Sequence, residues 1–249
     1  MGCLEGKVAV VTGAGRNGSI GRAIALGLAA AGADVVINGL DRAAEAEEAA
    51  RRVGEAGRKA FVVLADVSKV SECRRLIGEA VDHFGRLDIL INNAGTPRSQ
   101  ALSEITEDDW DAMLDLFLKG PFFLSQAAAP HMRAYGDGRI INISSEQAYI
   151  GHPRLAHYTA AKGGLRTLTK SLALAFAPEI TVNTVCPGPT ASDRFKEGSE
   201  YTEEVRMRIP LKRWGRPEDV AASVGFLASS DGDAYTGQTL DPNCGMVMP

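Results

Sequence analysis

The sequence predicts an α/β protein in which helices cover both faces of one doubly wound parallel sheet. Three observations lead to this prediction. Short apolar segments alternate with longer segments of helical periodicity along the 249 residues. The short segments are apolar at consecutive positions, which is typical of strands that are buried on both faces. No linker rich in proline, glycine or serine divides the chain, so we expect residues 1–249 to form a single domain.

The first four strands are expected where β-branched and apolar residues are concentrated, at Lys7–Thr12, Asp34–Asn38, Lys59–Leu64 and Leu87–Asn92. The helices between them are expected at Ile20–Ala31, Arg42–Ala56 and Ser68–Phe84. In the first of these helices, Ile20, Ile24 and Leu28 recur at helical spacing, which predicts one buried face. The second is rich in Ala, Glu and Arg and is expected to lie at the surface. Strand and helix in this order give right-handed crossovers between parallel strands.

The second half of the chain continues the alternation. Its strands are expected at Arg139–Ser144, Ile180–Cys186 and Gly237–Asp241, and its helices at Thr106–Tyr135, Leu155–Ala177 and Glu218–Ser229. The long helix over Thr106–Tyr135 is expected to break near Pro121 or Pro130, because proline lacks the N–H that a helix interior needs. Residues 187–217 are rich in Pro, Gly, Asp and Arg. A loop of this length in a compact protein predicts a substrate loop or lid.

The composition excludes several classes of protein. The net charge is −4, with 27 basic residues against 31 acidic ones, so we expect no nucleic-acid partner and no membrane partner. No apolar run reaches the roughly 18 residues that span a bilayer, and the first residues carry no apolar stretch of signal-peptide length. The four cysteines form no C-x-x-C pair, so neither a metal site nor a disulfide framework is expected. Together these features predict a cytoplasmic protein.

A glycine-rich turn follows the first expected strand and precedes the first expected helix. It reads Thr12-Gly-Ala-Gly-Arg-Asn-Gly-Ser-Ile-Gly21 and contains the pattern Gly13-x-Gly15-x-x-Gly18. Glycines let a pyrophosphate approach the backbone, and a helix N-terminus supplies N–H donors and partial positive charge. In this context the turn predicts a dinucleotide-binding fold of the Rossmann type, with a tight turn that binds no ligand as the alternative.

The residues after the second strand leave NAD and NADP both open as the cofactor. Many NAD-binding proteins place a carboxylate there for the ribose hydroxyls, but this chain has Gly39, with Asp41 two positions later. Arg16 in the glycine turn is placed to meet a 2′-phosphate, and Gly39 cannot repel one. These two features favour NADP. After the third strand, Asp66 with its neighbour Val67 suits a contact to the adenine, although Asp66 is also suited to capping the next helix.

A phenol and an ammonium group recur one helical turn apart in the expected helix Leu155–Ala177. Tyr158 and Lys162 lie at i and i+4, on one face of that helix. A nearby ammonium group favours the phenolate and lowers the pKa of Tyr from its usual value of about 10, which makes Tyr a usable acid or base. Ser145 lies thirteen residues upstream, just past a strand, where its hydroxyl could hold a carbonyl oxygen.

The chain resembles the short-chain dehydrogenase/reductase family over essentially all of its length. The resemblance rests on motifs in the family's order and spacing: Thr12–Gly21, Asp66, Asn92–Gly95, Ser145, Tyr158-x-x-x-Lys162 and Pro187–Gly188. It implies an NAD(P)-dependent oxidoreductase that interconverts a secondary alcohol and a ketone by hydride transfer. It also implies a homo-oligomer, a tetramer or a dimer, that packs through the Tyr–Lys helix and the C-terminal strand.

The resemblance also implies roles for residues at the matching positions. Tyr158 would be the general acid or base, Lys162 would depress the pKa of Tyr158 and bind the nicotinamide ribose, and Ser145 would polarise the substrate oxygen. The residues that would contact the cofactor are Gly13, Arg16, Ser19, Ile20, Asp41, Asp66, Val67, Asn93, Ala94, Gly95, Tyr158, Lys162, Pro187, Gly188 and Ser192. Ser192 matches the position of a family Thr that bonds the nicotinamide carboxamide.

Two departures from the family pattern leave alternatives open. The glycine turn spans ten residues rather than eight, which is similar to the branch that contains enoyl-acyl-carrier reductases, although that branch separates its Tyr and Lys by six residues and this chain by three. Phe117 stands twenty-eight residues before Ser145, where the family usually carries an Asn that holds a proton-relay water. Phe cannot bind that water. A cofactor-binding regulatory or scaffold protein with impaired catalysis, and an enoyl-thioester reductase, are therefore the alternative hypotheses.

The substrate is expected to be a small hydroxy or keto compound of polar or acidic character. The residues expected to line its pocket are Gln147, Tyr149, His152, Arg154 and the loop after Gly188, joined by Thr96, Pro97 and Arg98. Glu146, directly after Ser145, is expected to be structural rather than catalytic.

Overall fold

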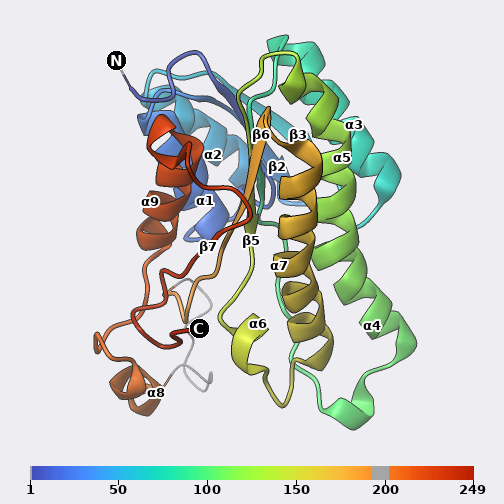
Figure 1. Ribbon diagram of the computed structural model, residues 1–249, viewed down its shortest axis with the longest axis vertical. Coiled ribbons are helices and arrows are strands. Elements are labelled where there is room, and N and C mark those ends of the chain that lie inside the picture. Colours follow the sequence, from blue (N-terminus) through green and yellow to red (C-terminus); the bar gives the residue numbers. More distant parts are fainter. Residues whose placement is uncertain (1, 192–201) are drawn as a thin grey trace.

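The computed structural model describes residues 2–191 and 202–249 of the chain. Seven strands form one sheet in the order β3-β2-β1-β4-β5-β6-β7, and every neighbouring pair is parallel (Figure 1). The strands are β1 (Val8–Val11), β2 (Asp34–Gly39), β3 (Ala60–Leu64), β4 (Ile89–Asn92), β5 (Gly138–Ile143), β6 (Ile180–Val185) and β7 (Thr239–Leu240). The chain moves outward from β1 to β3 and then returns to the other side of β1. This order confirms the predicted doubly wound parallel sheet.

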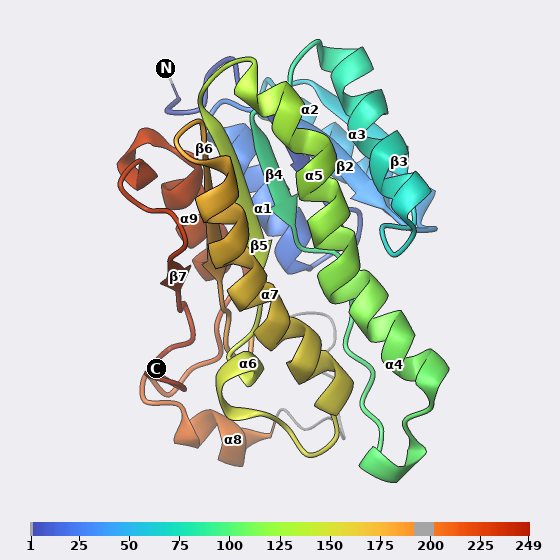
Figure 2. The same ribbon diagram turned by 45° about the vertical axis from the view of Figure 1, so that its right-hand side comes forward.

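Helices cover both faces of the sheet (Figures 1 and 2). One face carries α1 (Ile20–Ala30), α2 (Ala43–Glu55) and α9 (Pro217–Ala228). The other face carries α3 (Val70–Phe84), α5 (Gly120–Arg133) and α7 (Ala156–Phe176). The short helices α4 (Glu107–Leu114), α6 (Gln147–Ile150) and α8 (Glu203–Arg208) lie toward the end of the sheet where the strands finish.

Two apolar cores form between the sheet and its helix layers. Along β1, Ala9 and Val11 belong to the core under α1, α2 and α9, whereas Val10 belongs to the core under α3, α5 and α7. Each strand side chain is therefore buried whichever way it points, and burying one such aliphatic side chain contributes about 1.5–3 kcal/mol. This packing is the physical reason why the strands read as continuous apolar runs rather than as an alternating pattern.

A chain of buried polar side chains fixes α7 to the sheet. The Asn92 amide on β4 donates to Asn142 Oδ1 on β5 at 2.8 Å, and the Asn142 amide donates to Thr169 Oγ1 on α7 at 2.9 Å. Thr169 also accepts from Thr184 Oγ1 on β6 at 2.9 Å and donates to the Leu165 carbonyl at 2.9 Å. Leaving one of these buried groups unpaired costs about 1–3 kcal/mol. The register of α7 against three neighbouring strands is thereby fixed.

The expected long helix over Thr106–Tyr135 is interrupted, as predicted, close to Pro121. A π-helical segment, Asp115–Lys119, joins α4 to α5 without a gap, and Pro121 follows it as the second residue of α5. Pro130 does not break the helix, because α5 continues to Arg133. Pro130 and Gln126 are both exposed, so water can reach the carbonyl that the proline leaves without a partner.

Several short elements go beyond the prediction. The segment 187–217 contains α8 and an isolated bridge between Thr190 and Gly215, whereas residues 192–201 lie outside the described part. The turns Leu102–Glu104 and Ser230–Gly232 are 3₁₀ helices. Among the described residues, no helix is both long and apolar enough to cross a bilayer.

Candidate active site

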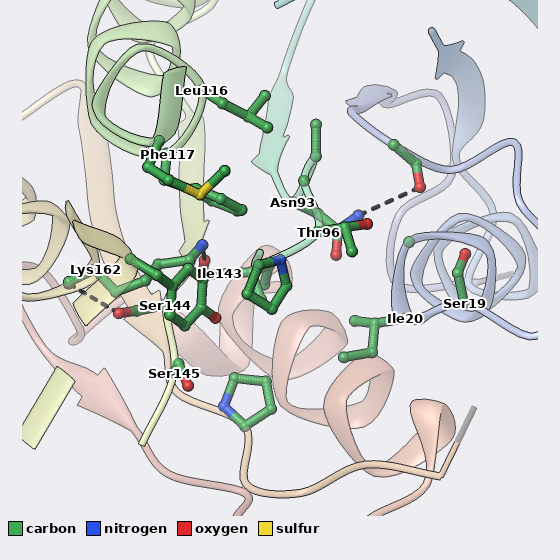
Figure 3. Close-up of a pocket in the computed structure, with 18 of the residues that line it drawn as sticks. Ser19, Ile20, Asn93, Thr96, Leu116, Phe117, Ile143, Ser144, Ser145 and Lys162 are labelled. Atoms are coloured by element: carbon green, nitrogen blue, oxygen red, sulfur yellow. Dashed lines mark hydrogen bonds between the residues drawn. The ribbon is translucent and has the colours of Figure 1, made fainter. Parts of the chain in front are cut away.

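A large cavity opens where the strands end. Its volume is about 1270 Å³, and residues that follow β1 through β6 line it together with part of α7 (Figure 3). Typical ligand pockets occupy roughly 300–1,000 Å³. The cavity therefore has room for a dinucleotide and a small substrate side by side. It lies at the carboxyl end of a parallel sheet, where α/β proteins bind their ligands.

The cavity wall brings together most of the residues that the sequence placed in the site. These are Gly13, Arg16, Ser19, Ile20, Asp41, Asp66, Val67, Asn93, Ala94, Gly95, Ser145, Gln147, His152, Tyr158, Lys162, Pro187 and Gly188. Thr96 and Pro97 line it as well. Ser192 lies outside the described residues.

Glycines in the turn after β1 are required by close backbone approaches. Gly13 has a φ of +66°, and a Cβ added to it would lie 2.8 Å from the Ala94 Cα. A Cβ on Gly21 would lie 2.4 Å from the amide nitrogen of Asn93. Such distances are shorter than any van der Waals contact, so side chains at these two positions would displace the β4 end of the site.

The buried side chain of Arg22 holds the ten-residue glycine turn against α2 by hydrogen bonds. It is buried in α1, and its guanidinium donates to Asn17 Oδ1, to the Gly15 carbonyl and to the Glu45 carbonyl. Burial lowers the pKa of Arg22, and the carboxylates of neighbouring α2 partly offset that effect. Sequence reasoning overlooked Arg22, although a single Arg among the apolar residues of α1 was the available signal.

Thr12 joins the end of β1 to the end of β4. Its hydroxyl donates to the Ile91 carbonyl at 3.1 Å and accepts from the N–H groups of Asn93 and Ala94 at 2.9 and 3.0 Å. The Asn93 side-chain amide donates back to the Thr12 carbonyl at 2.8 Å. These four bonds fix the segment that runs from Asn93 to Gly95 against the glycine turn.

The residues after β2 and β3 lie at the far end of the cavity from Tyr158. Asp41 lines this end beside Leu40, whose side chain is 63% exposed. Asp66 accepts from the Ser68 N–H at 3.1 Å and from the Ser68 hydroxyl at 2.6 Å. Burial tends to raise the pKa of Asp66, but these hydrogen bonds outweigh it and the pKa is lowered. Asp66 is thus an ionised cap for the next segment and still faces the cavity.

Tyr158 and Lys162 lie one helical turn apart on the face of α7 that borders the cavity. The Lys162 ammonium is buried, and it donates to the Ile143 carbonyl at 2.5 Å. Burial lowers the pKa of Lys162 to about 7. The Ser144 hydroxyl donates to the Lys162 carbonyl at 3.0 Å, which ties this turn of α7 to the end of β5 (Figure 3). Ser145 follows and presents its hydroxyl to the cavity.

Phe117 packs between the catalytic candidates and the β4 end. It is 3% exposed, and its ring meets the Tyr158 ring edge-on, with 5.1 Å between centroids and 84° between planes. The Lys162 ammonium lies 4.5 Å from the Phe117 ring centroid. Gly95, with a φ of +132°, makes room for the ring, because a Cβ there would lie 2.2 Å from Phe117 Cε1. An aromatic ring therefore fills the space where the family pattern expects an amide.

Three residues that the sequence predicted in the substrate pocket do not face the cavity. Tyr149 does not line the cavity, since its ring lies under the Arg166 guanidinium, 3.6 Å from its Cζ, and its hydroxyl bonds to Asp241. Arg98 turns away to an ion pair with Asp109 at 2.6 Å. Arg154 likewise turns away and donates to the Ser99 hydroxyl at 3.1 Å. The substrate end of the cavity is instead bordered by apolar side chains that the sequence did not single out, namely Met113, Ile150, Leu155, Val205 and Met246.

The described residues contain no group of three or more His, Cys, Asp or Glu placed to hold a metal ion. The four cysteines do not pair with one another.

Comparison with known proteins places the whole chain in one group. A family profile described as Enoyl-(Acyl carrier protein) reductase matches residues 13–247. A 3-oxoacyl-[acyl-carrier-protein] reductase FabG of Staphylococcus aureus is 42% identical over 244 residues, which cover 97% of this chain and 98% of that protein. A 2-dehydro-3-deoxy-D-gluconate 5-dehydrogenase of Escherichia coli is 40% identical over 242 residues, 95% of this chain and 94% of that protein.

Solved structures are similar over the same length. A Serratia marcescens short-chain dehydrogenase/reductase double mutant has a TM-score of 0.91 and 37% identity, covering 98% of both chains. A blue fluorescent protein from a metagenomic library, in complex with NADPH, has a TM-score of 0.91 and 34% identity, covering 98% of this chain and 99% of that one.

Proposed function

The chain belongs to the short-chain dehydrogenase/reductase family, and on that premise we propose that it reduces a ketone to a secondary alcohol, and catalyses the reverse reaction, with Tyr158 as general acid and base. One observation carries the proposal. A single cavity joins a glycine-lined half to a wall that holds Tyr158, Lys162 and Ser145. The first half suits a dinucleotide, and the second supplies a proton and a hydrogen-bond donor beside it.

The residues of the glycine half fit a nicotinamide dinucleotide. Gly13 and Gly21 are cradle positions that a Cβ would fill, and Ser19 caps the N-terminus of α1 beside them. Backbone N–H groups at such a terminus suit the pyrophosphate. At the other end, Pro187 and Gly188 suit the nicotinamide face. When bound, the cofactor supplies or accepts the hydride.

The protein's own groups handle the proton and the substrate oxygen. In reduction, the Tyr158 hydroxyl gives its proton to the oxygen that becomes the alcohol, and in oxidation the phenolate takes that proton back. The Lys162 ammonium, one turn away, favours the phenolate. The Ser145 hydroxyl donates a hydrogen bond to the same substrate oxygen, which stabilises the negative charge that develops there.

The cofactor is proposed to be NADP in preference to NAD. Arg16 lines the cavity at the glycine turn, and the position after β2 is Gly39, which carries no charge. The NADPH complex of a structural relative at 34% identity supports the same choice. Asp41 also lines this end, and its carboxylate is the feature that favours NAD.

The apolar border of the substrate end favours a substrate with an apolar arm. A 3-oxoacyl thioester has such an arm beside its ketone, and the 42%-identical relative is named for that reaction. A polar keto acid is the second candidate, because His152 and Gln147 line the cavity and the side-chain oxygen Oε1 of Gln147 is buried without a partner among the described residues. The E. coli relative at 40% identity is named for a substrate of that second class.

We also propose a homo-oligomer, a tetramer or a dimer, that packs through α7 and the C-terminal strand. Leu174 on α7 is 85% exposed, and an interface formed through α7 would remove this side chain from water. Light scattering of the purified protein tests this proposal, and a monomer mass at assay concentration would contradict it.

The test of the function is cofactor oxidation by the purified chain. NADPH and NADH are each offered with a 3-oxoacyl thioester, a polar keto acid and an enoyl thioester. We expect the ketone of at least one of the first two to be reduced, faster with NADPH, and Tyr158→Phe to lose most of the rate. Reduction of the enoyl thioester alone would establish the enoyl reductase instead. Cofactor binding without turnover of any substrate would support the regulatory or scaffold alternative.

A further inference from the structure

Glu146 is a buried acid in the wall of the catalytic cavity. It lies between β5 and α6, it is 5% exposed, and it lines the cavity directly after Ser145. Its own N–H donates to the Pro187 carbonyl at 3.1 Å, so its backbone is fixed. A carboxylate without a cation is costly to bury, and burial raises the pKa of Glu146 to about 7.

The surroundings of Glu146 contain few groups that could compensate its charge. In the described part of the chain, no Lys, Arg or His forms an ion pair with it, and its side-chain partners are the neighbouring Ser145 and Gln147. Titratable groups on the adjacent elements include Tyr149 on α6, Tyr158, Lys162 and Arg166 on α7, and Cys186 after β6. The Lys162 ammonium donates to the Ile143 carbonyl.

Two hydrogen bonds determine which oxygen of Glu146 carries its proton. Oε1 accepts from the Gln147 amide at 3.2 Å, and Oε2 lies 3.3 Å from the Ser145 hydroxyl. When the carboxyl group is neutral, its proton belongs on Oε2, because Oε1 already faces a donor. The proton of neutral Glu146 is therefore directed at Ser145 Oγ.

The Ser145 hydroxyl has one proton to give. It already accepts from the Gln147 N–H at 3.2 Å. When Glu146 is ionised, Oε2 can only accept a hydrogen bond. The Ser145 hydroxyl then donates its single hydrogen to Oε2. When Glu146 is neutral, Oε2 donates to Ser145 Oγ, and the Ser145 proton becomes available to the substrate oxygen. The two protonation states of Glu146 thus give opposite hydrogen-bond directions at Ser145.

We propose that Glu146 is a positioning residue whose carboxyl group controls whether Ser145 donates to the substrate oxygen. The inference rests on the proposed function, because it concerns the same ketone. Neutral Glu146 favours reduction, since Ser145 then stabilises the negative oxygen that forms as the hydride arrives. Ionised Glu146 withdraws that donor. The proposed positioning role goes beyond the structural role that the sequence predicts for Glu146.

The test compares the pH dependence of kcat/KM for ketone reduction in wild type, Glu146→Gln and Glu146→Ala. A group that titrates at about pH 7 is about tenfold less protonated at pH ~8 than at pH ~6, so the wild-type kcat/KM should carry a component that falls by about tenfold. Glu146→Gln keeps a donor toward Ser145 at every pH and should lose this component while retaining the low-pH rate within a few-fold. Glu146→Ala should be slow throughout. Glu55→Gln, on the exposed face of α2, is the matched control and should keep the wild-type profile.

Infrared difference spectroscopy of the protein without substrate gives a readout that does not depend on turnover. A protonated-carboxyl band should disappear in wild type as the pH is raised from about 6 to about 8 and should be missing in Glu146→Gln. The inference is overturned if that band is missing from wild type at low pH, or if active Glu146→Gln keeps the full pH component. If wild type reduces no ketone, the proposed function fails, and the role of Glu146 at Ser145 fails with it even when the band titrates.

Discussion

Replacing Phe117 by Asn tests what the aromatic ring does to Lys162. Within residues 2–191 and 202–249, the Lys162 ammonium has one hydrogen-bond acceptor, the Ile143 carbonyl, and the centroid of the Phe117 ring lies 4.5 Å from it. An Asn side chain would offer an amide oxygen in place of the ring. A hydrogen bond to a charged group contributes about 1.5–3 kcal/mol, and each pKa unit corresponds to about 1.36 kcal/mol. The pKa of Lys162 should therefore rise from about 7 by about one to two units.

The assay is the pH profile of kcat and kcat/KM for the preferred ketone. The Lys162 ammonium favours the Tyr158 phenolate. A lysine that stays charged to higher pH should therefore raise the apparent pKa of one limb of the pH profile by about one to two units. We also expect faster turnover, because the amide can hold a water beside Lys162 and pass protons to solvent. The variant should be less stable by about 3–5 kcal/mol, the usual cost of losing a buried Phe.

Two variants separate the chemistry from the loss of packing. Phe117→Leu keeps the space apolar and should lower the stability without raising the limb. Phe122→Asn removes a half-buried ring of α5 that pairs with Phe123, away from Lys162, and should leave the profile unchanged. The reasoning is refuted if Phe117→Asn has the wild-type profile and turnover, or if Phe117→Leu shifts the limb equally.

Three further predictions concern the frame of the site. Thr12→Val leaves two partly buried N–H groups without an acceptor and should lower the free energy of unfolding by about 2–4 kcal/mol in urea titrations, whereas Thr159→Val should cost less than about 1 kcal/mol. Unfolded chains release the Glu146 proton near pH ~4.5 and the folded protein near pH ~7, so between these values the stability of wild type should fall relative to Glu146→Gln by up to about 3 kcal/mol; parallel curves would contradict this. Gly21→Ala puts a Cβ 2.4 Å from the side-chain amide nitrogen of Asn93 and should weaken NADPH binding at least about tenfold in fluorescence titrations. Unchanged binding would contradict the role of Gly21 in the dinucleotide site.

The sequence predicted the strands and long helices because local chemistry determines them. Strands buried on both faces need continuous apolar runs, and the glycine turn is required by backbone approaches that only glycine permits. The residues around Tyr158 and Lys162 were found together because a helix fixes their separation and the strand order brings Ser145 to the same end of the sheet.

The features that the sequence did not predict depend on contacts between distant segments. Tyr149 was expected in the substrate pocket, but it lies two residues after Gln147 in α6 and turns toward Arg166 and Asp241. The role of Arg22 depends on carbonyls of the turn and of α2. The burial of Glu146 depends on how α6 and the loop after β6 close over it. None of these contacts has a spacing in the sequence that would identify it.

The most direct test of the central claim follows the hydride itself. The purified protein is given its preferred ketone and NADPH that carries deuterium on the transferable position of nicotinamide C4, and the alcohol product is analysed by NMR. We predict deuterium on the new carbinol carbon and on no other carbon, with the yield greatly reduced in Tyr158→Phe. An alcohol without deuterium at that carbon, or equal yields from wild type and Tyr158→Phe, would contradict the account.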